Sequence, residues 1–198
     1  MKSPFLYANA AIPLDFTICG VALKPFCLGH MMILEKFDSP FVSDDVENSA
    51  SLSDAIAHFY FALLICAHSY EDDLTLCNND NLLKATFETF VKNLLANMKL
   101  QTDWNIYEKI ASYKEYVRHY TQMPVFQVEQ QNNKVPSGID WKQNIFTIAK
   151  MEFGYTETEI LNMPLCRLFY EWCSYAEKNG AIRVQNEYEM ELVSKYAH

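Results

Sequence analysis

Apolar residues recur every three or four positions through most of this chain, and short polar stretches separate the windows in which they do so. This spacing gathers apolar side chains on one side of an α-helix, whereas a strand would show strict alternation. The pattern predicts an all-α, mainly helical protein with about six to eight helices. The expected helical windows are 26–37, 54–68, 82–98, 104–121, 140–153 and 165–179, with a shorter helix just before the last.

The last third of the chain carries the clearest helix boundaries. Thr156 and Glu159 have the spacing of a capping box, in which each side chain bonds the other residue's backbone N–H at the start of a helix. Pro164 suits the first turn of the next helix, and Gly180 suits its end because glycine adopts the left-handed conformation freely. We expect a short helix, a break at the proline, and then a longer amphipathic helix.

Other segments lack a helical period. Residues 1–25 are interrupted by three prolines, and within them residues 16–23 fit a short strand or extended segment that packs onto the helices. Residues 39–51 and 69–80 have the composition of polar, acidic loops. The acidic run 71–73 lacks the glycine-centred spacing of a calcium loop, so these side chains are expected in solvent.

Residues 126–138 are the best linker candidate, because they are rich in Gln and Asn and contain Pro-Ser-Gly. They separate an N-terminal helical region, residues 1–125, from a C-terminal helical subdomain, residues 139–198. We expect the two to pack together as one domain, since 198 residues fit a single core. The charged tail, 181–197, is compatible with a further helix.

Composition narrows the class of protein. Half of the residues are apolar and 14% are aromatic, which is ample for a packed core. The net charge of −9 argues against non-specific nucleic-acid binding, which needs clustered Lys and Arg, and against an anionic membrane surface. The most apolar run, 55–67, is shorter than the roughly 20 residues that cross a bilayer, and no signal peptide precedes Pro13. We expect a soluble, cytoplasmic protein that binds neither nucleic acid nor membrane.

Cysteines are spread through the chain, and several fall inside apolar helical windows. Such placement is typical of buried thiols in a reducing compartment. A chain of this size also needs no covalent staples, so we expect reduced cysteines rather than disulfides. The six are Cys19, Cys27, Cys66, Cys77, Cys166 and Cys173.

No catalytic motif is present: the chain lacks a Gly-x-Ser-x-Gly nucleophile, a glycine-rich phosphate loop and a His-Glu-x-x-His zinc motif. We therefore predict no enzyme activity, no catalytic residue, no cofactor and no metal. One alternative is a small helical enzyme of unknown reaction around Cys27, His30 and Glu35, although a core thiol beside a histidine explains the same spacing. A second alternative is a helix-turn-helix regulator formed by residues 156–178, with Arg167 on its second helix.

The aromatic side of the helix expected at 104–121 is the predicted binding surface. Tyrosine buries its ring and keeps its hydroxyl in water, which suits the rim of an interface. Aromatic positions on the helix 165–178 are included for the same reason. The predicted partner-contact residues are Trp104, Tyr107, Tyr113, Tyr120, Phe169 and Trp172.

Two segments carry a family resemblance. Residues 16–41, which include Gly20-Val-Ala-Leu-Lys-Pro-Phe-Cys-Leu-Gly-His30, resemble an N-terminal stretch of proteins encoded in phage-like gene clusters. Residues 154–180 include Thr156-Glu-Thr-Glu-Ile-Leu161, Asn162-Met-Pro-Leu165 and Tyr175-Ala-Glu-Lys-Asn-Gly180. This second segment resembles the C-terminal helical region of phage tail assembly chaperones.

The resemblance implies a non-enzymatic helical protein that holds the helix-rich tape-measure protein while the tail tube assembles. Such a protein needs apolar or aromatic grooves that receive amphipathic helices, and acidic charge that keeps the complex soluble. The predicted function is an assembly chaperone-like binding protein of a phage or prophage tail module. Its predicted partner is a tail or tape-measure-like protein, and homo-oligomerisation is left open.

Overall fold

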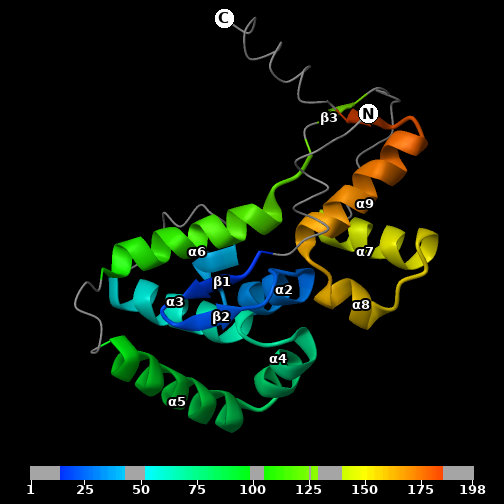
Figure 1. The fold of residues 1–198 in the computed structure, drawn as a ribbon. Coiled ribbons are helices and arrows are strands. Elements are labelled where there is room, and N and C mark those ends of the chain that lie inside the picture. The colour runs from blue at the N-terminus through cyan, green and yellow to red at the C-terminus, as the bar shows by residue number, and fades with distance from the viewer. Residues whose placement is uncertain (1–13, 43–51, 99–104, 125, 129–139, 185–198) are drawn as a thin grey trace, which may run out of the picture.

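The computed structural model describes residues 14–42, 52–98, 105–124, 126–128 and 140–184 (Figure 1). Within these ranges the chain is mainly helical, which confirms the expected all-α class with a short β segment near the N-terminus. The elements in chain order are β1 (Phe16–Ile18), β2 (Val21–Leu23), α2 (Leu28–Lys36), the 3-10 turn η1 (Pro40–Val42), α3 (Leu52–Cys66), α4 (Tyr70–Cys77), α5 (Asp80–Met98), α6 (Ile106–Thr121), β3 (Phe126–Val128), α7 (Trp141–Glu152), α8 (Glu157–Asn162), α9 (Leu165–Lys178) and β4 (Ile182–Val184).

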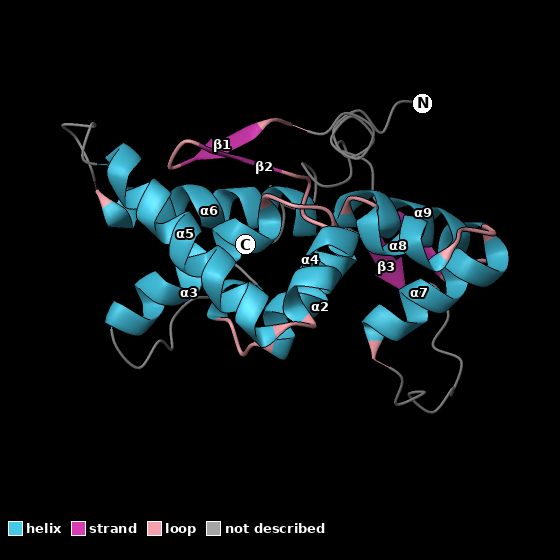
Figure 2. Ribbon diagram, turned by 90° about the horizontal axis from the view of Figure 1, so that it is seen from below, coloured by secondary structure: helices cyan, strands magenta, loops and turns pink. Residues whose placement is uncertain are grey.

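Helix α3 is the centre of the molecule. Figure 1 shows α6 along one side of it and α5 along the other, and Figure 2 shows α7, α8 and α9 grouped together at one end. The side chains of Phe59, Leu63 and Cys66 on α3 are fully buried. This arrangement agrees with the composition of α3, which is apolar on nearly every side and therefore suits a helix covered by others.

The tyrosines of α6 point into the core. Tyr113, Tyr116 and Tyr120 have no exposed surface, and their rings pack edge-on or tilted against one another and against the hairpin. The Tyr116 hydroxyl donates to the Lys24 carbonyl at 2.7 Å, and the Tyr120 hydroxyl donates to the Leu14 carbonyl at 3.1 Å. Burial is tolerated because each hydroxyl finds a partner, and these bonds tie the N-terminal segment to α6.

Strands β1 and β2 form an antiparallel hairpin in the region expected to be extended. Its two-residue loop consists of Cys19 and Gly20, whose φ angles are 57° and 76°. Both lie in the left-handed region, as the tightest hairpin turns require. The Lys24 N–H then donates to the Cys66 carbonyl at 2.7 Å, which fixes the end of the hairpin at the end of α3.

The predicted helix boundaries near the C-terminus are present. The Thr156 N–H donates to Glu159 Oε2 at 2.8 Å and the Glu159 N–H donates to Thr156 Oγ1 at 3.3 Å, so the capping box of α8 is complete. Gly180 has a φ of 66° just after α9. Pro164 lies at the N-cap of α9, one position before the expected first turn.

Three segments expected to be irregular or helical differ from expectation where the structure describes them. The predicted loop 69–80 contains α4, because Ser69 accepts a hydrogen bond from the Asp72 N–H and starts a helix there. The predicted linker 126–138 begins with β3 and the tail 181–197, expected to be compatible with a helix, contains β4, while residues 129–138 and 185–197 lie outside the described residues. These two strands pair with each other in antiparallel register, a partnership between distant segments that no local pattern reveals.

The two predicted regions meet in one hydrophobic cluster, which includes side chains from α2, α3 and α6 as well as α7, α8 and α9. The Leu165 N–H donates to the Phe26 carbonyl at 2.9 Å, and Cys27 forms an isolated bridge with Pro164. Gly29 allows α4 and α8 to approach the same turn of α2, because a Cβ there would lie 2.4 Å from the Tyr70 ring and 2.8 Å from the Leu161 carbonyl oxygen. The start of α2 is therefore the point at which both halves of the chain are joined.

Candidate functional site

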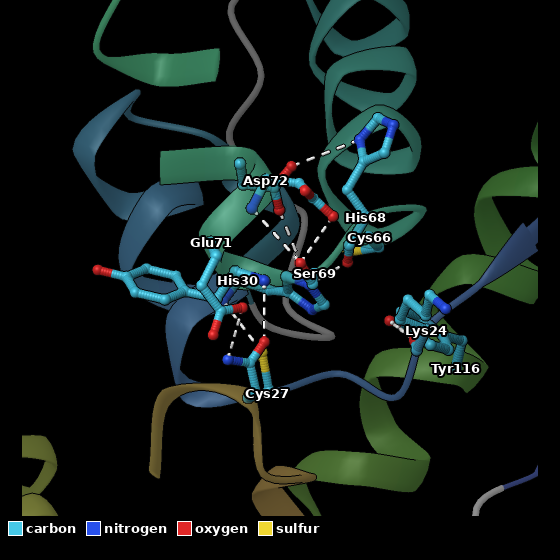
Figure 3. A network of polar contacts seen from close by, with 12 residues as sticks. Lys24, Cys27, His30, Cys66, His68, Ser69, Glu71, Asp72 and Tyr116 are labelled. Carbon is cyan, nitrogen blue, oxygen red and sulfur yellow. Dashed lines mark hydrogen bonds and ion pairs between the residues drawn. The ribbon is translucent and has the colours of Figure 1, made fainter. Parts of the chain in front are cut away.

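A carboxylate lies between two imidazoles near the point where α3 ends and α4 begins. Figure 3 shows the residues that carry the imidazoles, His30 and His68. The side chain of Asp73, on α4, has no exposed surface. Its Oδ1 lies 3.5 Å from His68 Nδ1, and its Oδ2 lies 3.8 Å from Nε2 of His30, on α2. We call Asp73, His68 and His30 the acid–histidine cluster. The expectation that the acids at 71–73 are all solvated is wrong for Asp73.

Local hydrogen bonds around the start of α4 orient the Asp73 side chain toward the interior. Ser69 caps α4 and donates from its hydroxyl to Asp72 Oδ2 at 2.7 Å, so Asp72 remains at the surface while the next residue turns inward. Asn162 Oδ1, at the end of α8, accepts from the Tyr70 N–H at 3.0 Å. The first turn of α4 is thus held from both sides, and the inward position of Asp73 follows from that placement.

His30 is neutral and its tautomer is fixed by its partner. Its Nε2 lies 3.0 Å from the His68 carbonyl oxygen, which only accepts, so Nε2 carries the proton. Its Nδ1 is buried without a hydrogen-bond partner among the described residues. Burial lowers the pKa of His30 to about 4, so the ring is uncharged at neutral pH.

Asp73 and His68 influence each other's protonation. Burial raises the pKa of Asp73 to about 6, although His68 opposes the rise. The Asp73 carboxylate in turn raises the pKa of His68 above its ordinary value, against the effect of partial burial. Neither Asp73 oxygen has a hydrogen-bond donor in range among the described residues, and 3.5 Å is longer than a good hydrogen bond. The contact is an ion pair whose acid is poorly solvated.

The predicted Cys27, His30 and Glu35 group does not converge. Cys27 Sγ accepts from the His30 backbone N–H at 3.4 Å, but Glu35 Oε1 and Oε2 bind Lys142 Nζ at 2.7 and 2.8 Å on another surface. Burial raises the pKa of Cys27 to about 12, so its thiol stays protonated and is a poor nucleophile at neutral pH. Within the described ranges, no group of three metal-ligating side chains is arranged to hold an ion.

His68 also faces an apolar cleft between α3 and α5. The side chain of His68 is 39% exposed, which places one end of the ring in the cleft and the other against Asp73. The cleft has a volume of about 400 Å³. Its lining residues are Leu64, Ala67, His68, Ala85, Thr86, Thr89, Phe90 and Asn93.

A second, smaller cleft of about 250 Å³ lies toward the N-terminal half of α3. It is also bounded by α5, through Phe87. Its other lining residues are Phe37, Asp54, Ala57, His58 and Phe61. We call the two together the α3–α5 clefts.

Helix α5 is the least embedded of the long helices in the described ranges. Leu94 is its only fully buried residue, whereas Leu82 and Leu95 are exposed. Its apolar side meets α3 through half-buried side chains such as Phe87 and Phe90. A long helix held in this way leaves apolar surface open beside its contact with α3.

The predicted aromatic contact residues are placed differently from expectation. Trp104 lies outside the described residues, and Tyr107 is 66% exposed. Tyr113 and Tyr120 are buried in this chain's own core, so their proposed role in binding a partner is corrected: an aromatic α6 packs on α3 and the hairpin instead.

The aromatic residues predicted on α9 also serve the fold. Phe169 is buried and packs its ring against Trp141 at a centroid distance of 5.5 Å, so its predicted contact role is corrected as well. Trp172 is half-buried and packs against both hydrophobic clusters. On the outer side of α9, Arg167 Nε donates to Glu171 Oε1 at 3.1 Å, so this guanidinium is already engaged.

Sequence reasoning missed the acid–histidine cluster and the α3–α5 clefts. The signal present was the Ser69 to Asp72 spacing of an N-cap, which would have placed Asp73 on a helix. Comparison with family models, curated proteins and solved structures finds no match for this chain. No helix in the described part of the chain is long and apolar enough to cross a bilayer.

Proposed function

We propose that this chain is a non-enzymatic binding protein that receives a basic amphipathic helix of a protein partner in the α3–α5 clefts. The observation that carries this proposal is the weak embedding of α5, which leaves apolar clefts open against α3. Helix-in-groove recognition needs apolar hollows that accept side chains from successive turns of one helix. The two clefts provide such hollows between the same two helices, α3 and α5.

The spacing of the clefts suits a helix. One is lined by α3 around Ala57 and Phe61, and the other by α3 around Leu64 and Ala67. These positions are about two helical turns apart, or roughly 10 Å at 1.5 Å per residue. Apolar residues at i and i+7 of an incoming helix have the same separation.

The acidic charge of the helices near the clefts, of which Asp54 lines the smaller cleft, favours a basic partner. Helices α3, α4 and α5 together carry six acidic residues and two lysines, and the whole chain has a net charge of −9. A partner helix with Lys or Arg beside its apolar face is favoured by this field, whereas an anionic lipid surface is repelled. The acids are Asp54, Glu71, Asp72, Asp73, Asp80 and Glu88, and the lysines are Lys84 and Lys92.

The resemblance of residues 16–41 and 154–180 to phage-encoded proteins indicates a class of partner. Phage tail assembly chaperones hold helix-rich tape-measure proteins, and that task matches a groove for amphipathic helices. We therefore extend the proposal to an assembly chaperone-like role in a phage or prophage tail module. The predicted partner is a tape-measure-like tail component.

A peptide-binding experiment tests the proposal. A labelled synthetic helix of Leu, Ala and Lys is titrated with the protein and followed by fluorescence anisotropy, beside a matched peptide with Glu in place of Lys. The Lys peptide should bind, and the Glu peptide should bind at least roughly tenfold more weakly because like charges meet. Equal binding of both peptides, or of neither, would contradict the proposal.

Two matched variants locate the binding site on α5. Ala85→Trp fills the larger cleft, and Ala96→Trp places the same ring on an exposed part of α5 that does not line either cleft. We expect Ala85→Trp to weaken binding of the Lys peptide by roughly tenfold, the loss of one buried anchor. Ala96→Trp should leave it within about twofold. The same loss in both variants would show that the peptide does not occupy the cleft.

A further inference from the structure

His68 connects the interior of the molecule to the larger cleft. It is the one residue in the described lining of that cleft whose side chain titrates, and its Nδ1 faces the fully buried Asp73. The side chain of Asp73 has no exposed surface of its own. A proton gained or lost by this pair therefore changes the charge at the floor of the cleft.

The groups around the pair are otherwise constant near neutral pH. On α2, His30 is neutral and Cys27 is a protonated thiol, and on α3 burial raises the pKa of Cys66 to about 12. On α4, the Ser69 hydroxyl lowers the pKa of Asp72, which stays ionised. Helix α5 contributes no charged residue to the lining of this cleft. Asp73 and His68 are the members of this group that titrate between mildly acidic and mildly alkaline pH.

We propose, on the basis of the proposed binding function, that the Asp73–His68 pair makes the affinity of the larger cleft for a basic helix depend on pH. With both groups protonated, the pair carries one positive charge and repels the partner. With both deprotonated, it carries one negative charge and attracts the partner. Binding of a basic helix is thus coupled to proton release, and the helix is released as the pH falls.

The expected size of the effect follows from the charge change. A change of two charges at the floor of a partly solvated cleft alters affinity on the order of tenfold. The Lys peptide carries its label on the N-terminal amine, so it has no group that titrates between about pH 5.5 and 8, since lysine has a pKa near 10. Its dissociation constant should fall by about this factor as the pH rises across that range.

The test measures peptide affinity across this pH range for three variants. His68→Gln should lose about half or more of the pH dependence, because only Asp73 then titrates beside the cleft and its pKa rises further without His68. Asp73→Asn should keep a pH dependence but shift its midpoint downward, because His68 loses the acid that raises its pKa. The control is His119→Gln, on α6 away from the clefts, which should keep the wild-type profile. Circular dichroism at each pH confirms that every variant is folded.

The outcomes separate this inference from the proposed function. Peptide binding that is constant across the pH range, or a wild-type profile in His68→Gln, overturns the pH coupling and leaves the binding function standing. Absence of binding at every pH overturns the binding function. The pair is also tested without any peptide, by following the His68 ring proton by NMR. Its midpoint should lie above that of an ordinary histidine and fall in Asp73→Asn, and an unchanged midpoint would overturn the coupling.

Discussion

Replacement of Asp73 by asparagine tests whether the buried carboxylate lowers the free energy of unfolding. The change keeps the size and shape of the side chain and removes its charge. Burial raises the pKa of Asp73 from 3.8 to about 6, a net effect that already includes the attraction of His68. At 1.36 kcal/mol for each pKa unit, keeping the carboxylate ionised costs the folded protein about 3 kcal/mol at alkaline pH. A buried amide with imperfect hydrogen bonds costs about 1 kcal/mol, so the net gain expected from Asp73→Asn is about 2 kcal/mol.

The sign of the pH dependence can be worked out in the same way. A group whose pKa is raised by folding stabilises the fold fully below its unfolded pKa, and this contribution is lost as the pH rises through the folded pKa. For Asp73 the loss falls between about pH 4 and 7. His68 also has a raised pKa, and its contribution is lost at still higher pH. Asp73→Asn should therefore gain stability relative to wild type as the pH rises from 4, and pH 8 gives the clearest comparison.

Urea unfolding followed by circular dichroism at pH 5 and pH 8 measures this difference. The matched control is Asp72→Asn, at the exposed first turn of α4, where negative charge favours the helix. It should destabilise the protein slightly, a change of the opposite sign. If Asp73→Asn is instead destabilised by more than about 1 kcal/mol at pH 8, the ionised acid holds the fold together and our reasoning is refuted.

Three further substitutions test single contacts by urea unfolding. Gly29→Ala should cost about 2–3 kcal/mol because its new Cβ would lie 2.4 Å from the Tyr70 ring, and a loss below about 1 kcal/mol would show that α4 moves away freely. Tyr116→Phe removes the 2.7 Å bond to the Lys24 carbonyl and should cost about 1–2 kcal/mol, whereas an unchanged midpoint would mean that another donor reaches this carbonyl. Thr156→Ala removes the capping box of α8 and should cost about 1 kcal/mol, while Thr156→Ser should recover most of it; no difference between the two would argue against the cap.

Much of the fold was predictable from the sequence alone. The helical class, most helix windows, the capping box at Thr156 and the extended segment around Cys19 and Gly20 were all expected, because each depends on residues within one or two turns of each other. The prediction of a loop at 69–80 is an error of the same local kind, since the acidic run after Ser69 fits the first turn of a capped helix as well as a solvated loop.

Only the tertiary structure decided the features on which function depends. An aromatic stripe such as that of α6 has the same spacing whether it fills a core or binds a partner, and the packing of α3 and the hairpin against Tyr113 settled the matter. His30, His68 and Asp73 come from three segments that meet when α2 packs against α4. The sequence periodicity of each segment does not predict this contact. A side chain's pKa and its access to a partner are set by what surrounds it in space, and the chain acquires those surroundings only by folding.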